Sequence, residues 1–167
     1  IGMALASKGK VVLSIFDGIG GGLLSLRRAG IEVSQYWRLE WCPEWNSVVA
    51  AQGDPAVRNC GAVDVKAVFG TEVGEHWPVW ASVDVTLVAF PCQDVARANP
   101  NGPGMEGNNS SHLVYAIRIM RAIMRVNKRM KFFLECVAGW NKRGQAHLPW
   151  VNSLLGVGEP RKFCSSV

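Results

Sequence analysis

The sequence has no long apolar run, no paired-cysteine motif and no cluster of histidines, and each absence excludes a class of protein. No apolar stretch approaches the ~20 residues of a membrane-spanning helix, and residues 1–10 lack the apolar core of a signal peptide. The five cysteines are odd in number and lack C-x-x-C spacing, which argues against a disulfide framework or a zinc site. We therefore expect no membrane association, no metal and an intracellular, reducing compartment, with nucleus, bacterial cytoplasm and organelle all left open.

Charged residues are scarce as well, at 19% of the chain against 49% hydrophobic residues. In 167 residues this composition suffices for one domain with a core, and it is not that of a disordered chain. We expect a single domain over residues 1–167, in which residues 141–167 form a weakly patterned tail. The net charge of +5 is concentrated in one segment, because residues 118–131 carry six cations and no acid.

Short apolar runs alternate with helical patterns along the chain. We expect strands over residues 11–16, 34–40, 60–65, 83–90 and 131–137. We expect helices over residues 23–29, 43–51, 113–128 and 148–155, with Ser110 or Ser111 capping the third. This order predicts an α/β fold, a Rossmann-like parallel sheet with helices on both faces. Ligands bind such sheets at the carboxyl ends of the strands.

A glycine-rich turn, residues 17–22, follows the first expected strand. Leu23 stands where the G-x-G-x-x-G motif needs its third glycine, so a nicotinamide cofactor is poorly supported. The turn either binds an acceptor through backbone N–H groups at a helix N-terminus or is a tight turn without a ligand. Glu40, at the end of the second strand, either accepts the hydroxyls of a ribose or is an ordinary exposed acid. Together the two features favour a nucleoside-containing cofactor.

Five ordered segments resemble the motifs of the cytosine-C5 DNA methyltransferases, namely residues 16–22, Glu40, Asp64, residues 90–93 and residues 134–137. Their order and spacing match that family over roughly residues 10–140. The resemblance implies a class I methyltransferase fold, here incomplete, with S-adenosyl-L-methionine as the cofactor. It also implies transfer of a methyl group to C5 of cytosine in DNA.

The same resemblance implies which residues hold the methionine and ribose portions of the cofactor. Phe16 would lie along the adenosine. The turn at Asp17, Gly18 and Gly20 would hold the methionine portion. Glu40 would bind the ribose.

A second group of residues is implied for the adenine. Trp41 would stack on the base, Asp64 with Val65 would address its amino edge, and Pro91 would also contact the cofactor. Alternatively, Trp41 is a core aromatic, because residues 37, 41 and 45 are tryptophans at four-residue spacing.

Two residues near strand ends have the chemistry that methylation at C5 needs. Attack of a thiolate on C6 makes C5 nucleophilic, and Cys92 follows the most apolar strand. A free thiol is mostly protonated at neutral pH, so such a nucleophile needs activation. Glu135 would donate a proton to N3, kept protonated by the apolar residues around it. The alternatives are a buried structural cysteine and an acid paired with an arginine.

A flipped-out cytosine is needed to reach such a pocket, and residues 98–109 are placed where the family has a loop that closes over the base. Downstream, Arg118, Arg121, Arg125 and Lys128 recur at three- and four-residue steps and share one helix face. This face either contacts nucleic-acid phosphates or is an ordinary solvated face.

The sequence departs from the family in two places. Cys136 stands where the family has asparagine, and the printed chain ends about thirty residues after the last expected strand, without a target-recognition region. Two hypotheses follow. The chain is a cytosine methyltransferase completed by another chain or segment, acting on DNA or, as a variant, RNA. Alternatively, it is a catalytically inactive methyltransferase-like subunit, a pseudoenzyme with a structural or RNA-associated role in an assembly.

Overall fold

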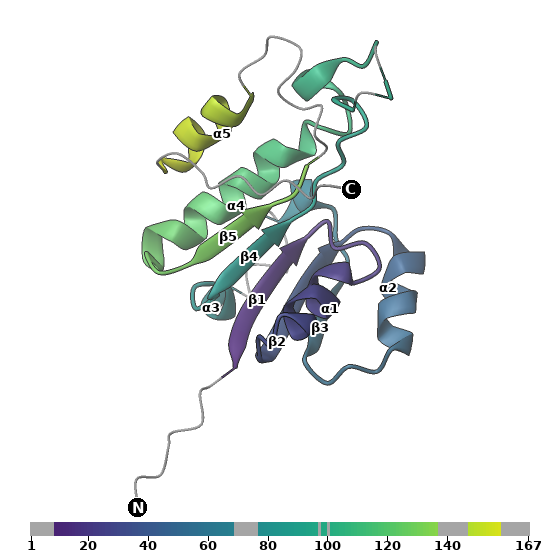
Figure 1. The fold of residues 1–167 in the computed structure, drawn as a ribbon, viewed down its shortest axis with the longest axis vertical. Helices are drawn as coiled ribbons and strands as arrows, with labels where there is room; N and C mark the ends of the chain where they lie inside the picture. The colour runs from purple at the N-terminus through teal and green to yellow at the C-terminus, as the bar shows by residue number, and fades with distance from the viewer. Residues whose placement is uncertain (1–8, 69–76, 97, 100, 137–146, 158–167) are drawn as a thin grey trace, which may run out of the picture.

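Five parallel strands form one sheet in the computed structural model (Figure 1), which describes residues 9–68, 77–96, 98–99, 101–136 and 147–157. The sheet order is β3-β2-β1-β4-β5, and every neighbouring pair is parallel. The strands are β1 (Lys10–Ile15), β2 (Val33–Glu40), β3 (Val57–Ala62), β4 (Val85–Val88) and β5 (Lys131–Leu134). The predicted Rossmann-like sheet is confirmed.

The helices lie between the strands in the predicted order. They are α1 (Gly21–Arg28), α2 (Pro43–Ala51), α3 (Trp77–Trp80), α4 (His112–Val126) and α5 (His147–Leu155), with short 3₁₀ turns η1 (Val65–Ala67) and η3 (Gly104–Glu106). The bounds of α2 are those predicted, because Pro43 suits its first turn and Gly53, at φ 64°, adopts the left-handed conformation just past its end. α3 and the 3₁₀ turns were not predicted, since three or four residues carry no periodic signal.

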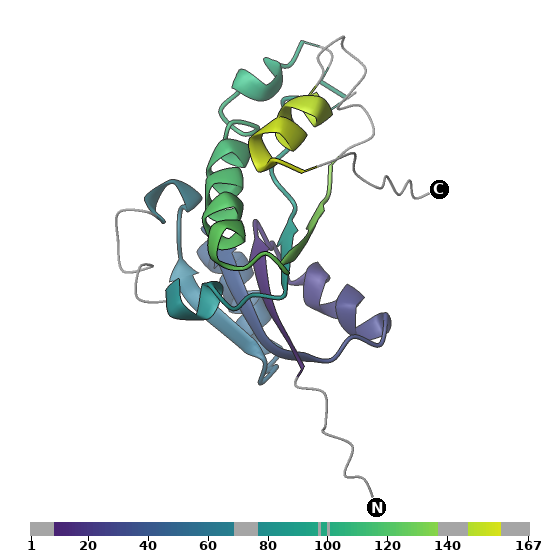
Figure 2. The same ribbon diagram turned by 90° about the vertical axis from the view of Figure 1, so that its left-hand side faces the viewer.

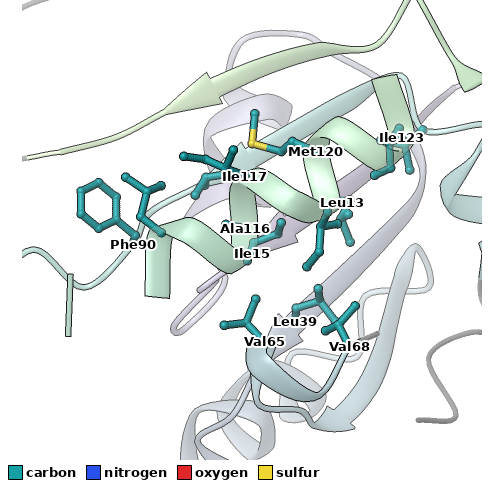
Figure 3. Close-up of a cluster of buried hydrophobic side chains, with 14 of the residues drawn as sticks. Leu13, Ile15, Leu39, Val65, Val68, Phe90, Ala116, Ile117, Met120 and Ile123 are labelled. Carbon is teal, nitrogen blue, oxygen red and sulfur yellow. The ribbon is translucent and has the colours of Figure 1, made fainter. Parts of the chain in front are cut away.

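Alternate residues of β1 face opposite layers, which is why helices cover both faces of the sheet. Leu13 and Ile15 pack against α4 in the larger core cluster (Figure 3), whereas Val12 packs with Leu23 of α1 on the other face. Figure 2 shows α4 and α1 on opposite sides of the sheet. The chain moves outward from β1 to β3 and then returns to β4, so the switch point lies between the carboxyl ends of β1 and β4.

The ends of β3, β4 and β5 come earlier in the chain than predicted; β4, expected over residues 83–90, ends at Val88. β3 ends at Ala62, after Gly61 takes a φ of 82°, so Asp64 lies beyond the strand and caps η1 instead. β5 ends at Leu134, so Glu135 follows the strand rather than lying within it. At the start of α4, Ser111 occupies the N-cap position, as predicted, but its side chain makes no capping hydrogen bond. The N–H of Ser110 donates to Asp94 of a distant loop instead, a contact that local sequence does not reveal.

Candidate functional site

A cavity of about 240 Å³ opens near the carboxyl ends of β1, β2 and β4. Five residues predicted to bind the cofactor line it: Phe16, Trp41, Asp64, Val65 and Pro91. They come from four separate segments, so the fold brings together what the sequence kept apart. Four further lining residues, Leu39, Val63, Asn109 and His112, were not predicted. For Asn109 and His112 the available signal was their position at the start of the longest helix, which begins at His112.

Phe16 begins the glycine turn in a strained conformation. Its φ of 60° places a bulky residue in the left-handed region, which is costly and recurs at functional sites. Its N–H donates to the Leu39 carbonyl at 2.9 Å, and its ring centroid lies 6.3 Å from that of His112. The turn therefore directs an aromatic side chain from β1 toward the start of α4.

Trp41 lies in the short connection between β2 and α2, with 66% of its surface exposed while it lines the cavity. The alternative of a core aromatic is therefore wrong. Across the cavity, Oδ1 of Asp64 accepts a hydrogen bond from the Lys66 N–H at 2.9 Å. Its other oxygen has no partner in the described part of the chain, so it is available to an amino group.

Glu40 connects the glycine turn to the segment that carries Trp41. The residue is 2% exposed, so the alternative of an ordinary exposed acid is wrong. One carboxylate oxygen accepts from the Gly18 N–H at 2.9 Å and the other from the Cys42 N–H at 3.0 Å. A carboxylate has about four acceptor sites, so two remain for a ligand's hydroxyls.

Asp17 is held from inside by a buried network that sequence reasoning missed. Its side chain, 1% exposed, accepts hydrogen bonds from Ser14 Oγ at 2.7 Å and from Tyr36 Oη at 2.5 Å, and forms an ion pair with Arg38. Arg38, fully buried, donates in turn to the Gly18 carbonyl at 2.6 Å. The Asp17 carboxylate therefore stabilises the turn from its buried side. The groups of the turn that remain available to a ligand are those of its backbone.

Burial of Tyr36, and next the negative charge of Asp17, raise the pKa of the tyrosine well above its ordinary value. Tyr36 therefore stays a neutral donor throughout the physiological range. A sequence signal for this network did exist: Arg38 and Glu40 are charged residues within the second predicted strand, and the structure buries both. Buried charges are seldom unpaired, so each required a partner.

Cys92 follows β4 in a turn that is tied to the start of α4. The residue is partly buried against the larger core cluster. Two positions on, the Asp94 carboxylate accepts from the N–H groups of Asn109 and Ser110 at 2.8 and 3.0 Å. These hydrogen bonds, that of Ser110 foremost, lower the pKa of Asp94. Asp94 therefore fixes the end of the loop formed by residues 98–109 close to the turn that bears Cys92. This is the loop that is expected to close over a flipped-out base.

The substitution Gly107→Ala is expected to break this connection. A β-carbon at Gly107 would lie 2.2 Å from Oδ2 of Asp94, so the carboxylate must move away from its donors. We expect a loss of about 1–3 kcal/mol in the free energy of unfolding, measured by urea denaturation. Gly21→Ala is the control, since a β-carbon there meets nothing within 4 Å. Equal midpoints for the two variants would contradict the tight packing around Asp94.

Glu135 and Cys92 lie at the same edge of the sheet, since the Glu135 N–H donates to the Val88 carbonyl at 2.9 Å and Cys92 follows the same strand. The glutamate is nevertheless exposed, and it lines a second cavity of about 470 Å³ together with Asp17 and Phe133. Apolar side chains such as Leu87 and Val88 also line this cavity, but the described residues leave the glutamate open to solvent rather than in the expected dry pocket. The physical reason is that β5 is the edge strand, and Phe133 beside it is itself exposed.

The four cations predicted to share one face of the long helix, Arg118, Arg121, Arg125 and Lys128, are all exposed. Leu113, Ile117 and Met120 on the opposite side are buried. Lys128 lies two residues past the end of α4, and Met124, expected on the apolar side, is only partly buried and lies beside Arg121 and Arg125. Among the described residues, no group of His, Cys, Asp or Glu could hold a metal ion. In the same part of the chain, no helix is long and apolar enough to cross a bilayer.

Comparison with known proteins yields a likeness in structure. The sequence matches no protein-family profile. The fold is similar to that of the Dnmt2 methyltransferase from S. pombe, with a TM-score of 0.51 and 15% sequence identity. The match covers 87% of this chain and 40% of that structure, so the chain spans well under half of its neighbour. The chain therefore has a Rossmann-like methyltransferase fold.

Proposed function

We propose that this chain is the cofactor-binding and nucleophile-bearing part of a methyltransferase that uses S-adenosyl-L-methionine and modifies C5 of cytosine in DNA. The observation that carries the proposal is the convergence of Phe16, Trp41, Asp64, Val65 and Pro91 on one cavity. The turn that bears Cys92 continues directly from Pro91. The similarity in fold to a methyltransferase supports the same assignment.

The residues of the cavity suit an adenosine. Trp41 offers an exposed aromatic face for stacking, and Asp64 has a free carboxylate oxygen for an amino group. Glu40 does not line the cavity, but it lies between Leu39 and Trp41, which do, and it retains acceptor sites for hydroxyls. At about 240 Å³ the cavity is smaller than the roughly 300–1,000 Å³ of most ligand sites, which suits a nucleoside rather than the whole cofactor. Asp17, Gly18 and Gly20 do not line this cavity; the turn that they form follows Phe16, which does, and we assign the methionine portion to the backbone of that turn.

The chemistry that follows uses two side chains of this chain. The Cys92 thiolate would add to C6 of a flipped-out cytosine while Glu135 protonates N3, which leaves C5 nucleophilic. The cofactor, when bound, supplies an electrophilic methyl group. After methylation at C5, water takes the proton from C5, the thiolate leaves C6, and N3 returns its proton to Glu135, which restores the aromatic ring. Glu135 needs the drier surroundings that a further segment or a second chain would supply.

A catalytically inactive subunit with a structural or RNA-associated role is the second candidate. The exposure of Glu135 on the far side of the sheet from α4, and the cysteine at position 136, favour it. This candidate keeps the fold and loses the proton donor. A cytosine in RNA is a variant of the first candidate, since nothing at Cys92 distinguishes the two acceptors.

Binding of S-adenosylhomocysteine, measured by calorimetry, tests the cofactor site. Trp41→Ala is expected to weaken binding roughly 5- to 150-fold, because stacking of a base on an aromatic side chain is worth about 1–3 kcal/mol. Trp45→Ala is the matched control, since Trp45 is also exposed and does not line the cavity.

Equal weakening by the two substitutions would remove Trp41 from the site. No binding by the folded wild-type chain would contradict the proposed cofactor site itself, and so leave the second candidate.

A further inference from the structure

A basic groove lies between α4 and α5. Its volume is about 340 Å³, and it is lined by Arg121, Met124, Arg125, Lys128, Leu155 and Gly156. The three cations are exposed and take part in no ion pair or side-chain hydrogen bond in the described part of the chain. The lining therefore combines three unpaired positive charges with aliphatic side chains and no acid.

The groove is built on firmly packed elements. On the opposite side of α4, Met120 and Ile123 are buried against the sheet, and on α5 Val151 is 1% exposed. A cation in the last turn of a helix also interacts favourably with its dipole, which accounts for Arg125. Arg121, a full turn earlier, and Lys128, past the helix end, gain nothing from that effect.

The groove lies near the amino ends of the strands, whereas the cofactor cavity lies near their carboxyl ends. Asn127, just past α4, donates to the Val83 carbonyl ahead of β4, whereas His112 at the start of α4 lines the cavity. At 1.5 Å per residue, Arg121 and Arg125 lie roughly 14 and 20 Å along the helix from His112. A duplex that ran along α4 from the cavity would therefore bring to the groove the backbone about six base pairs from the target nucleotide, at ~3.4 Å per base pair.

We infer that this groove binds the backbone phosphates of duplex DNA that flank the target nucleotide. The inference rests on the proposed function, which makes DNA the substrate. Phosphate contacts need cations and no base-specific geometry, which is what the groove offers. A protein partner would be expected to find aromatic anchors and fewer charges at the centre of its interface, and none of the lining residues is aromatic.

The salt dependence of binding to a 30-base-pair duplex, followed by fluorescence anisotropy, tests the inference. Arg121→Gln with Arg125→Gln is expected to reduce the slope of log affinity against log salt by about 2, because each arginine removed leaves one phosphate without its neutralising cation. Glutamine preserves helix propensity, so α4 is expected to stay folded. The control, Arg28→Gln with Arg58→Gln, removes the same charge from α1 and β3 and is expected to change the slope far less.

Several outcomes would overturn the inference. An equal decrease in slope for both double variants would mean that net charge, not the groove, governs binding, and an unchanged slope would remove DNA from the groove. Displacement of the duplex by polyglutamate at equal charge concentration would assign the groove to acidic proteins instead. The groove variant is expected to bind S-adenosylhomocysteine as the wild type does, so failure here is distinguishable from failure of the cofactor site.

Discussion

Arg38→Met is expected to lower the free energy of unfolding by about 3–5 kcal/mol, because it leaves the Asp17 carboxylate charged, buried and without its cation. Both side chains of this ion pair are at most 1% exposed. Such a loss is a large part of the roughly 5–15 kcal/mol that stabilises a typical domain. Urea denaturation of the purified variant measures it. Because Arg38 also donates to Gly18, we expect the glycine turn to lose its shape and cofactor binding to fall as well.

The chain offers a matched control in its exposed Arg–Asp pair. Arg27 lies 2.8 Å from Asp54, with side chains 47% and 17% exposed. Arg27→Met is expected to cost no more than about 1 kcal/mol, since solvent screens such pairs. Combining Asp17→Asn with Arg38→Met is expected to cost less than the sum of the single changes, by about 0.5–3 kcal/mol. Equal effects of the two methionine substitutions would show that the buried pair does not determine stability.

Cys92→Ala is expected to abolish a covalent complex between the chain and duplex DNA that contains 5-fluorocytosine. Fluorine at C5 cannot leave as a proton does, so the thioether at C6 persists and is visible on a denaturing gel. The experiment is done with S-adenosyl-L-methionine present. With wild-type protein we expect a complex that survives denaturation, and with Cys92→Ala we expect none.

Cys60→Ala is the control for this experiment. Burial raises the pKa of the Cys60 thiol to about 11, so on the order of one thiol in a thousand is ionised at pH 8. We therefore expect this variant to form the complex as the wild type does. A complex that persists in Cys92→Ala would assign the nucleophile to another residue. No complex from a wild-type chain that binds S-adenosylhomocysteine would contradict the proposal that this chain by itself supplies the active nucleophile, and would favour the inactive subunit.

Local patterns predicted the secondary structure where the chain carries strong signals. Pro43 and Gly53 mark the ends of α2, and the apolar run before Pro91 contains β4, which lies between β1 and β5 in the sheet. Predictions failed where a single residue changes the backbone direction. At Gly61 a positive φ ends β3 early, and this moved Asp64 from a strand to a cap. Whether a glycine takes that conformation depends on its neighbours in space.

The buried network around Asp17 shows what pattern reasoning could not supply. Asp17 and Arg38 lie 21 residues apart and meet because Ser14 of β1 pairs with Arg38 of β2 in the sheet register. A shift of one residue would turn Arg38 to the other face. The sequence marks both residues as charges near apolar strands. Their partnership exists only once the strands are aligned.

By itself, the sequence determined the order of the strands and helices, the parallel sheet that follows from that order, and the types of residue at the strand ends. These are local properties, since they depend on periodicity, turn residues and the identity of each side chain. The tertiary structure alone decided that Phe16, Trp41 and Pro91 line one cavity and that Glu135 lines a different cavity. Which way a side chain faces is set by strand register, turn geometry and the layers packed above it, and these depend on residues far away in the chain.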